Sequence, residues 1–410
     1  MSDLNRREFL RQSILLAVGM TLVSCDDEKG DTVNESPGAL LGDQPSKRVV
    51  IIGAGMSGLV AGYELTRAGH DVIILEARDR VGGRVLTLRE PFSDGHFAEA
   101  GAARIPPDHD LTLGYADYFG LMLDPFYPES NYFVNMSSGN RTLISASEYV
   151  NDPPWAGFST NRKDFVKIRD GTDRLPRAFA NFITNQIHLA TPVESIEQNA
   201  DGVVVRVSSG TEFNADRALC TVPLPVLNRI QFTPSLSDEK VAAISGGYNY
   251  AASTRVFFQF ANRFWENEGL NGWGNTDWPE EIWHPTWDRE GPKGILMSYM
   301  YYGRAVELDQ LIEEDRIEHV LNRWDSVFPG VHDHVENGVS HSWALQEWSG
   351  GAWASPTAGQ DEALAEHIGE AEGRIHFAGE HASEYHGWMQ GALVSGLRAA
   401  TEIHEGDLYL

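Results

Sequence analysis

Cysteine is scarce in this 410-residue chain, which contains only Cys25 and Cys220. Two thiols cannot form the network of bridges that stabilises a small disulfide-rich domain, so that class of protein is excluded. The chain must instead fold around hydrophobic cores. Its length and its 42% content of hydrophobic residues suit roughly two or three ordinary globular domains.

Positive charge is scarce as well. Lys and Arg together number 32 against 59 Asp and Glu, which gives a formal net charge of −27. Such a surface repels a phosphate backbone, so we expect no nucleic acid partner. The same field attracts small cations such as amines, and it favours neutral or cationic substrates over acidic ones.

Long hydrophobic runs are also missing, because the apolar stretch from Ser13 to Ser24 is shorter than the about 20 residues that span a bilayer. The stretch follows Arg6-Arg7 and ends at Cys25, an arrangement that resembles a twin-arginine export signal with a lipoprotein cleavage site. We therefore expect a signal peptide over residues 1–25. This predicts a protein of the periplasm or the outer face of the cell membrane. Membrane association would come only through a lipid on Cys25, and the alternative is that Cys25 is merely removed.

A glycine-rich turn opens the folded part of the chain, after an acidic flexible linker expected over residues 26–46. The β-branched run of residues 47–52 predicts a buried parallel strand, which leads into the turn GAGMSG and a helical stretch. A second predicted strand ends at Glu76. In this dinucleotide-binding pattern Gly53 permits the tight turn, Gly55 lets the backbone approach a pyrophosphate, and Glu76 binds a ribose.

Two further motifs give the chain a family resemblance. Residues 76–84 (EARDRVGGR) follow the second strand directly. Residues 374–400 combine a strand that leads into a turn at Gly379-Glu380, the stretch HGWMQGA of residues 386–392, and a helix that includes residues 395–400. With the glycine-rich turn, these motifs resemble those of the FAD-dependent amine oxidases, the family of monoamine, polyamine and L-amino-acid oxidases. The resemblance implies FAD as the cofactor, with an arginine that neutralises its phosphates. The residues it implies in FAD binding are Gly53, Gly55, Met56, Ser57, Gly58, Glu76, Ala77, Arg78, Gly83, Arg84, Gly101, Ala102, Ala103, Arg104, Val193, Gly379, Glu380, Gly387, Trp388 and Met389.

The resemblance also implies an α/β fold. A Rossmann-type FAD-binding domain of the GR2-like flavoprotein kind would be interleaved with an α+β substrate domain built on an antiparallel sheet. The helical insertion of venom-type relatives is reduced here to a short polar loop. We expect the FAD-binding domain to use residues 47–103, 177–250 and 366–404. We expect the substrate-binding domain to use residues 104–176 and 251–365.

The substrate site is implied by a few residues. Arg104 lies in the sequence GAARIP, which is similar to that of L-amino-acid oxidases, where the Arg binds the substrate carboxylate. The alternative is an Arg paired with a protein carboxylate. Tyr299 would be a second carboxylate donor, or else a core tyrosine, and Gly387 would contact the substrate. Trp388, a substrate contact too, and Trp353 match two aromatic rings that flank the amine in the family, and two core tryptophans are the alternative.

One departure from the family concerns the residue beside the flavin N5 atom. Relatives usually place there a Lys that holds a water molecule, and this chain has Arg255. An Arg hydrogen-bonds a water but does not deprotonate, which puts fast reaction with O2 in question more than amine oxidation. We take Arg255, Trp353 and Trp388 as the catalytic candidates. Ala352 stands where covalently flavinylated relatives carry a Cys, so non-covalent FAD is expected, and no metal site is expected.

The predicted function is FAD-dependent oxidative deamination of an L-amino acid to a 2-oxo acid, ammonia and H2O2. Hydride would pass from Cα to flavin N5, and O2 would be the second substrate. One alternative is a monoamine or polyamine oxidase or dehydrogenase. Another is a membrane-tethered flavoprotein that is not an oxidase. The resemblance is also compatible with a homodimer.

Overall fold

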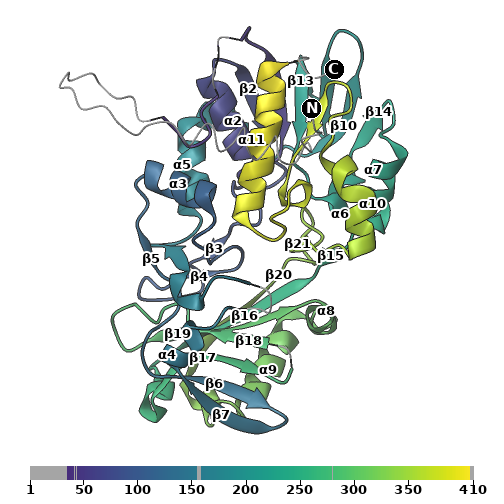
Figure 1. The fold of residues 1–410 in the computed structure, drawn as a ribbon. Coiled ribbons are helices and arrows are strands. Elements are labelled where there is room, and N and C mark those ends of the chain that lie inside the picture. The colour runs from purple at the N-terminus through teal and green to yellow at the C-terminus, as the bar shows by residue number, and fades with distance from the viewer. Residues whose placement is uncertain (1–34, 41, 43, 155–157, 279, 407–410) are drawn as a thin grey trace, which may run out of the picture.

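The computed structural model describes residues 35–40, 42, 44–154, 158–278 and 280–406. The predicted signal peptide, including Cys25, lies outside the described residues, so export and lipidation stay predictions. The described chain forms two lobes, one containing α2 and α11 and the other containing β16 to β19 (Figure 1). Among the described residues, no helix is long and apolar enough to cross a membrane.

A parallel sheet lies at the centre of the first lobe. Its strand order is β22-β13-β1-β2-β9, and all neighbours are parallel. Buried aliphatic side chains on both faces explain why the run VVII at the start of the domain adopts a central strand. Cys220 ends one of these strands, and burial raises the pKa of its thiol to about 12. The strands are β1 (Arg48–Ile52), β2 (Asp71–Leu75), β9 (Ile187–His188), β13 (Arg217–Cys220) and β22 (Ile375–Phe377).

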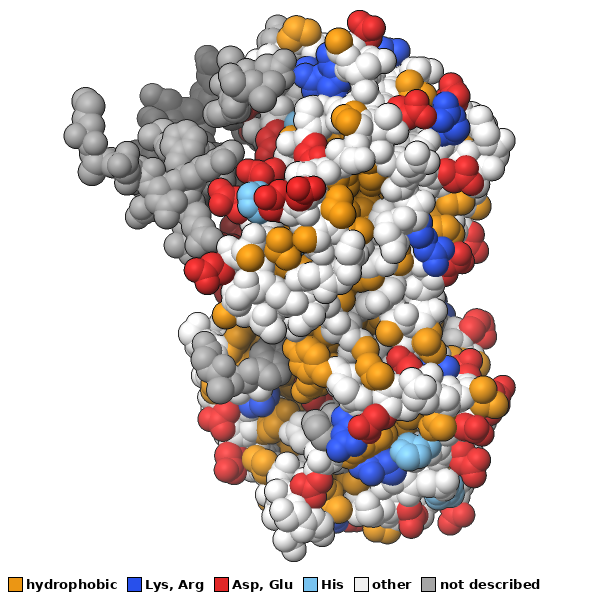
Figure 2. Space-filling model, turned by 90° about the vertical axis from the view of Figure 1, so that its right-hand side faces the viewer, with side chains coloured by type: hydrophobic (Ala, Val, Ile, Leu, Met, Phe, Trp, Pro, Cys, Tyr) orange, Lys and Arg blue, Asp and Glu red, His pale blue; other side chains and the backbone are white. Residues whose placement is uncertain are grey.

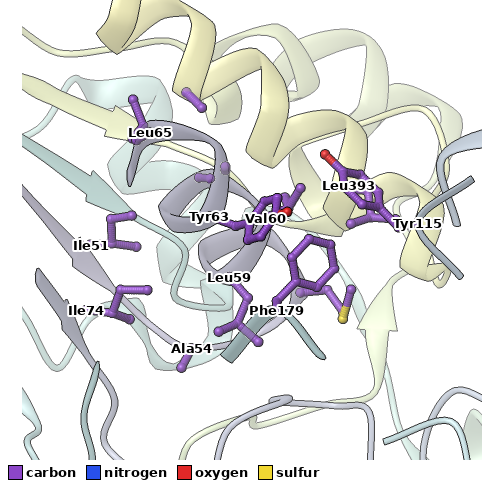
Figure 3. Close-up of a cluster of buried hydrophobic side chains, with 14 of the residues drawn as sticks. Ile51, Ala54, Leu59, Val60, Tyr63, Leu65, Ile74, Tyr115, Phe179 and Leu393 are labelled. Atoms are coloured by element: carbon purple, nitrogen blue, oxygen red, sulfur yellow. The ribbon is translucent and has the colours of Figure 1, made fainter. Parts of the chain in front are cut away.

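Helices from both ends of the chain cover this sheet. Figure 3 shows Leu59 and Val60 of α2 (Met56–Arg67) among Ile51 and Ile74 of the sheet, with Leu393 of α11 (Met389–Glu405) nearby. The two helices also approach closely because Gly396 has no side chain to collide with the carbonyl oxygen of Ser57. Aromatic residues of α3 (Asp110–Tyr118) and α5 (Arg174–Phe182) complete this core.

A smaller sheet of order β12-β11-β10-β14 packs on the other side of the first lobe. Its pairs are antiparallel except the parallel pair of β10 and β14. The strands are β10 (Val193–Gln198), β11 (Val203–Val207), β12 (Glu212–Ala215) and β14 (Gln231–Thr233). The neighbouring helices are α6 (Leu224–Leu227), α7 (Asp238–Ala242), which continues as a π-helix over Ala243–Gly247, and α10 (Ala358–Gly369).

The second lobe is built on a seven-stranded sheet of order β20-β16-β19-β18-β17-β6-β7. All pairs are antiparallel except β17 with β6. On one face Val256 and Phe258 pack with Trp324 of the covering helix α9, and on the other face lie Arg255 and Phe257. The elements are β6 (Tyr132–Ser137), β7 (Asn140–Ser145), β16 (Ser253–Phe260), β17 (Leu270–Thr276), β18 (Glu280–Trp283), β19 (Gly294–Tyr301), β20 (Val335–Ser342), α8 (Gly303–Leu308) and α9 (Glu313–Trp324).

Short two-stranded ladders join the lobes. The expected α/β fold with a Rossmann-type domain and a second sheet is confirmed by these layers. The segment of residues 104–176 is divided in the structure, since α3 packs in the first lobe while β6 and β7 belong to the second. The remaining ladders and helix are β3 (Thr87–Leu88) with β4 (Ala98–Glu99), β5 (Leu123–Pro125) with β8 (Val166–Ile168), β15 (Tyr250–Ala251) with β21 (Trp353–Ala354), and α4 (Ala146–Val150).

Candidate active site

A cavity of about 1370 Å³ runs from the ends of β1 and β2 to the sheet of the second lobe. This volume includes space that is open to solvent. The lining draws residues from both lobes, an arrangement that suits an extended dinucleotide with a substrate beside it. The predicted residues that line it are Gly53, Gly55, Met56, Ser57, Glu76, Ala77, Arg78, Gly83, Arg84, Gly101, Ala102, Val193, Arg255, Tyr299, Trp353, Gly379, Glu380, Gly387, Trp388 and Met389. Three predicted residues, Gly58, Ala103 and Arg104, are not part of its lining.

The glycine-rich turn after β1 is shaped to admit a ligand. Gly53 has a φ of 106°, a value that favours glycine. A Cβ on Gly58 would collide with the carbonyl oxygen of Gly53, so Gly58 acts in packing rather than at the cavity surface. A Cβ on Gly55, in contrast, would meet no protein atom within 4 Å. The open space in front of Gly55, at the N-terminus of α2, is where a pyrophosphate fits.

Glu76 lies at the end of β2, beside this turn. One carboxylate oxygen accepts the backbone N–H of Ala54 at 2.7 Å, and the other accepts that of Arg78 at 2.8 Å. These bonds orient the carboxylate into the cavity, where its remaining lone pairs suit ribose hydroxyls. The Arg78 guanidinium donates to the Ser349 hydroxyl at 2.7 Å, which ties this edge of the cavity to the loop before β21.

Arg84 and Glu380 form an ion pair across the middle of the cavity, with 2.9 Å between Nη1 and Oε1. Glu380 also accepts the backbone N–H groups of Ala354 and Gly387. Burial alone would raise the pKa of the Glu380 carboxyl, but the Arg84 charge and these hydrogen bonds hold that pKa below its ordinary value. The pair therefore stays charged, and it fixes the loops that carry Trp353 and Trp388.

Tryptophans form the wall at the far end of the cavity. Trp353 and Trp388 both line it, as the family resemblance implies, and Trp388 packs edge-on against His109 with 4.8 Å between ring centroids. Burial lowers the pKa of His109 to about 4, so this neighbouring ring is neutral at ordinary pH. Two further tryptophans, Trp343 and Trp348, line the cavity. We did not predict them, although the regular spacing of Trp343, Trp348 and Trp353 along one segment was visible in the sequence.

Other lining residues also escaped prediction. Arg229 faces the cavity and lies over the Trp348 ring at 5.0 Å, held by an ion pair with Glu347. Thr221 and the residues after β13 contribute a further side of the cavity. Thr221 reaches the site because β13 pairs with β1.

The floor of the cavity comes from the second sheet. Arg255 donates from Nη1 to the carbonyl oxygens of Glu99 and Gly101, both at 2.6 Å. Its guanidinium carbon lies 4.3 Å from the centre of the Tyr299 ring, on the adjacent strand. The buried Nε atom of Arg255 has no hydrogen-bond partner in the described part of the chain. Arg255 thus brings a fixed positive charge to the end of the cavity that holds the tryptophans.

Arg104 is paired with a protein carboxylate in the structure, which is the alternative that the sequence left open. Its Nη1 atom lies 3.2 Å from Oε2 of Glu281 and 3.2 Å from the Tyr127 hydroxyl. Its guanidinium also stacks on Trp283 at 4.8 Å. Burial opposes ionisation, but the Glu281 carboxylate holds the pKa of Arg104 above its ordinary value. Glu281, which lies outside the cavity lining, is a partner of Arg104 that sequence reasoning missed.

The fold and the cavity together define a class, a dinucleotide-binding oxidoreductase with a second, sheet-based substrate lobe. The open cradle at Gly55 and the orientation of Glu76 fit the phosphate and ribose of a bound dinucleotide.

The family model for "Flavin containing amine oxidoreductase" matches residues 56–158 and 154–404, and a model for "Pyridine nucleotide-disulphide oxidoreductase" matches residues 4–94. The chain belongs to the flavin-containing amine oxidoreductases, and its cofactor is FAD.

Curated relatives that match most of this chain include L-amino-acid oxidases. An L-amino-acid oxidase of Siganus canaliculatus is 30% identical over 88% of this chain and 86% of its own length. An L-amino-acid oxidase of Demansia vestigiata is 27% identical over 88% of this chain and 87% of its own length.

Solved structures of other amine oxidases share the fold. A putrescine oxidase bound to putrescine aligns with a TM-score of 0.75 and 22% identity, covering 88% of this chain and all of its own. The cyclohexylamine oxidase of Brevibacterium oxydans IH-35A aligns with a TM-score of 0.77 and 19% identity, covering 88% of this chain and 99% of its own. At these identities the likeness concerns the fold alone.

Proposed function

We propose that this flavoprotein oxidises the α-amino group of an L-amino acid, giving a 2-oxo acid, ammonia and H2O2. The observation that carries the proposal is the fixed charge of Arg255, which faces the cavity and bonds to carbonyl oxygens, with Arg104 near the same Trp283 ring. A cationic floor of this kind favours a substrate that carries a carboxylate. The relatives named above support the same class of substrate.

The residues at the site would have different roles in binding the substrate. Arg255 and Tyr299, which line the cavity, would orient the carboxylate together with Arg104, which lies outside the lining. Trp353 and Trp388 would hold the neutral amine between apolar faces and exclude water. FAD, which Glu76, Arg84 and the turn at Gly55 would hold, would supply the acceptor for the hydride from Cα and a route for the two electrons to O2. No protein base is needed if the amine arrives deprotonated.

The test is anaerobic bleaching of the bound flavin by a panel of L-amino acids, D-amino acids and amines, followed by reoxidation in air with assay of H2O2. We expect L-amino acids to bleach the flavin. Arg104→Ala is expected to raise KM for them by about tenfold or more, since one charge-assisted contact to the carboxylate is removed. An unchanged KM would contradict the role of Arg104.

A second candidate function is oxidation of an amine without a carboxylate. The specific observation in its favour is the ion pair of Arg104 with Glu281, because an Arg that is already paired has less need of a substrate anion. Bleaching by amines such as hexylamine, with no response to any amino acid, would decide for this candidate.

A further inference from the structure

Four residues form a row across the sheet of the second lobe, on the face that meets the cavity. His341, Arg255, Tyr299 and Glu281 are cross-strand neighbours in register on β20, β16, β19 and β18. Neighbouring strands lie about 4.8 Å apart, so each residue in the row is one strand further along. Arg255 and Tyr299 line the cavity. Glu281 comes next, directly beyond Tyr299.

Glu281 is held firmly in this place. Its Oε2 atom accepts Trp283 Nε1–H at 2.8 Å and lies 3.2 Å from Arg104 Nη1. The side chains of Glu281 and Arg104 are only 16% and 10% exposed. The partially buried pair is therefore poorly screened by solvent, and the loss of either partner leaves the other charge uncompensated.

A substrate carboxylate that binds Arg104 must compete with Glu281. The carboxylate of an amino acid with a neutral side chain takes Arg104 away from Glu281. The Glu281 carboxylate is then left without a cationic partner from the substrate. An amino acid with a cationic side chain offers Glu281 a replacement partner. The complex then contains two ion pairs, whereas the free protein has one at this position. The Tyr299 ring lies between this position and Arg255, and Trp283 adds an aromatic face that attracts a cation.

We propose that Glu281 determines substrate specificity by favouring L-amino acids with a cationic side chain, whose ammonium or guanidinium group pairs with Glu281 when the substrate carboxylate takes Arg104. The inference rests on the proposed function, and it names the substrate class of that site.

The test compares FAD-loaded wild-type protein with Glu281→Gln, which keeps an oxygen for Trp283 and removes the charge. We measure kcat/KM for L-lysine and for L-norleucine, a neutral amino acid of similar length. The ratio of the two is expected to fall by about tenfold or more in Glu281→Gln, mainly through KM. Glu281→Asp, which retains a charge on a shorter side chain, is expected to give an intermediate ratio.

A binding measurement separates specificity from catalysis. Hexanoate has a carboxylate and no amino group, and we titrate it against the flavin absorbance. It is expected to bind about tenfold more tightly to Glu281→Gln than to the wild type, because Arg104 is released. Asp288→Asn is the matched control, since it removes a carboxylate that is paired at 2.9 Å with Lys167 elsewhere in the lobe. It should leave both the ratio and hexanoate binding unchanged.

The outcomes are distinguishable. An unchanged ratio in Glu281→Gln, with both amino acids still reducing the flavin, overturns the role of Glu281 and leaves the proposed function standing. Reduction by hexylamine but by neither amino acid refutes the proposed function and the inference with it. If Glu281→Gln fails to retain FAD, Glu281→Asp becomes the deciding variant, and an unchanged ratio in it overturns the inference.

Discussion

Glu99 shows how the fold moves the titration of one group toward neutral pH. Its carboxylate oxygens accept the backbone N–H of Thr172 and the hydroxyl of Thr87, both at 2.8 Å. Its own carbonyl oxygen accepts Arg255. Burial raises the pKa of Glu99 from its ordinary 4.5 to about 7, even though the hydrogen bonds act in the opposite direction.

A pH dependence of stability follows at this residue. Between pH 4.5 and about 7 the folded protein holds a proton on Glu99 that the unfolded chain has released, so the contribution of Glu99 to the free energy of unfolding decreases as pH rises through about 7. We expect Glu99→Gln to lessen the fall in Tm between pH 5 and 8 by a few degrees in calorimetry. The exposed Glu362→Gln should leave the slope unchanged, and equal slopes in both variants would contradict this expectation.

The two helices that flank the parallel sheet depend on glycine at their contact. A Cβ on Gly396 of α11 would collide with the Ser57 carbonyl oxygen and lie 2.7 Å from Val60 Cγ1, both in α2. Because α2 begins at the glycine-rich turn, its displacement also moves the pyrophosphate cradle.

Gly396→Ala is therefore expected to lower the free energy of unfolding by about 1–3 kcal/mol and to weaken FAD retention. Thermal unfolding and release of FAD on gel filtration measure the two effects. Gly359→Ala is the control, since its Cβ would meet no atom within 4 Å in α10, and alanine there should leave Tm unchanged or slightly raised. Similar losses in both variants would show that the α2–α11 contact is not the cause.

Elements whose signals are local could be predicted from the sequence, and the contacts between distant elements could not. The strand, turn, helix and strand of the opening unit follow from β-branched runs and glycine spacing, so β1, α2 and β2 appear where they were expected. The pairing of Arg104 with Glu281 joins residues 177 positions apart. It depends on the register of β18 with β19, which no local pattern in the sequence encodes. Trp343 and Trp348 likewise become site residues only when β20 and β21 are placed beside the first lobe.

At the scale of the whole molecule, charge is the dominant feature. Acidic side chains are spread over both lobes on the face in Figure 2, in keeping with the net charge of −27. The cavity floor, in contrast, is cationic at Arg255. A zwitterion with an additional positive charge is attracted by the surface and can still place its carboxylate on the floor.

An effect of ionic strength on catalysis follows. We expect kcat/KM for L-lysine to fall several-fold between low salt and about 0.3 M NaCl, because salt shortens the Debye length to below about 10 Å and screens the attraction. The value for L-norleucine, which carries no net charge, should change little. Stopped-flow reduction of the flavin measures both, and an equal salt effect on the two substrates would exclude long-range steering.

The interleaving of the chain also has a consequence for biosynthesis. The turn after β1 is translated before the second lobe, whereas β22, Glu380 and the N-terminus of α11 are translated after it. Since these later segments form part of the cavity lining, a nascent chain cannot enclose FAD until they have been translated. A chain truncated before β22 therefore lacks part of the cofactor site, however well its glycine-rich turn has folded.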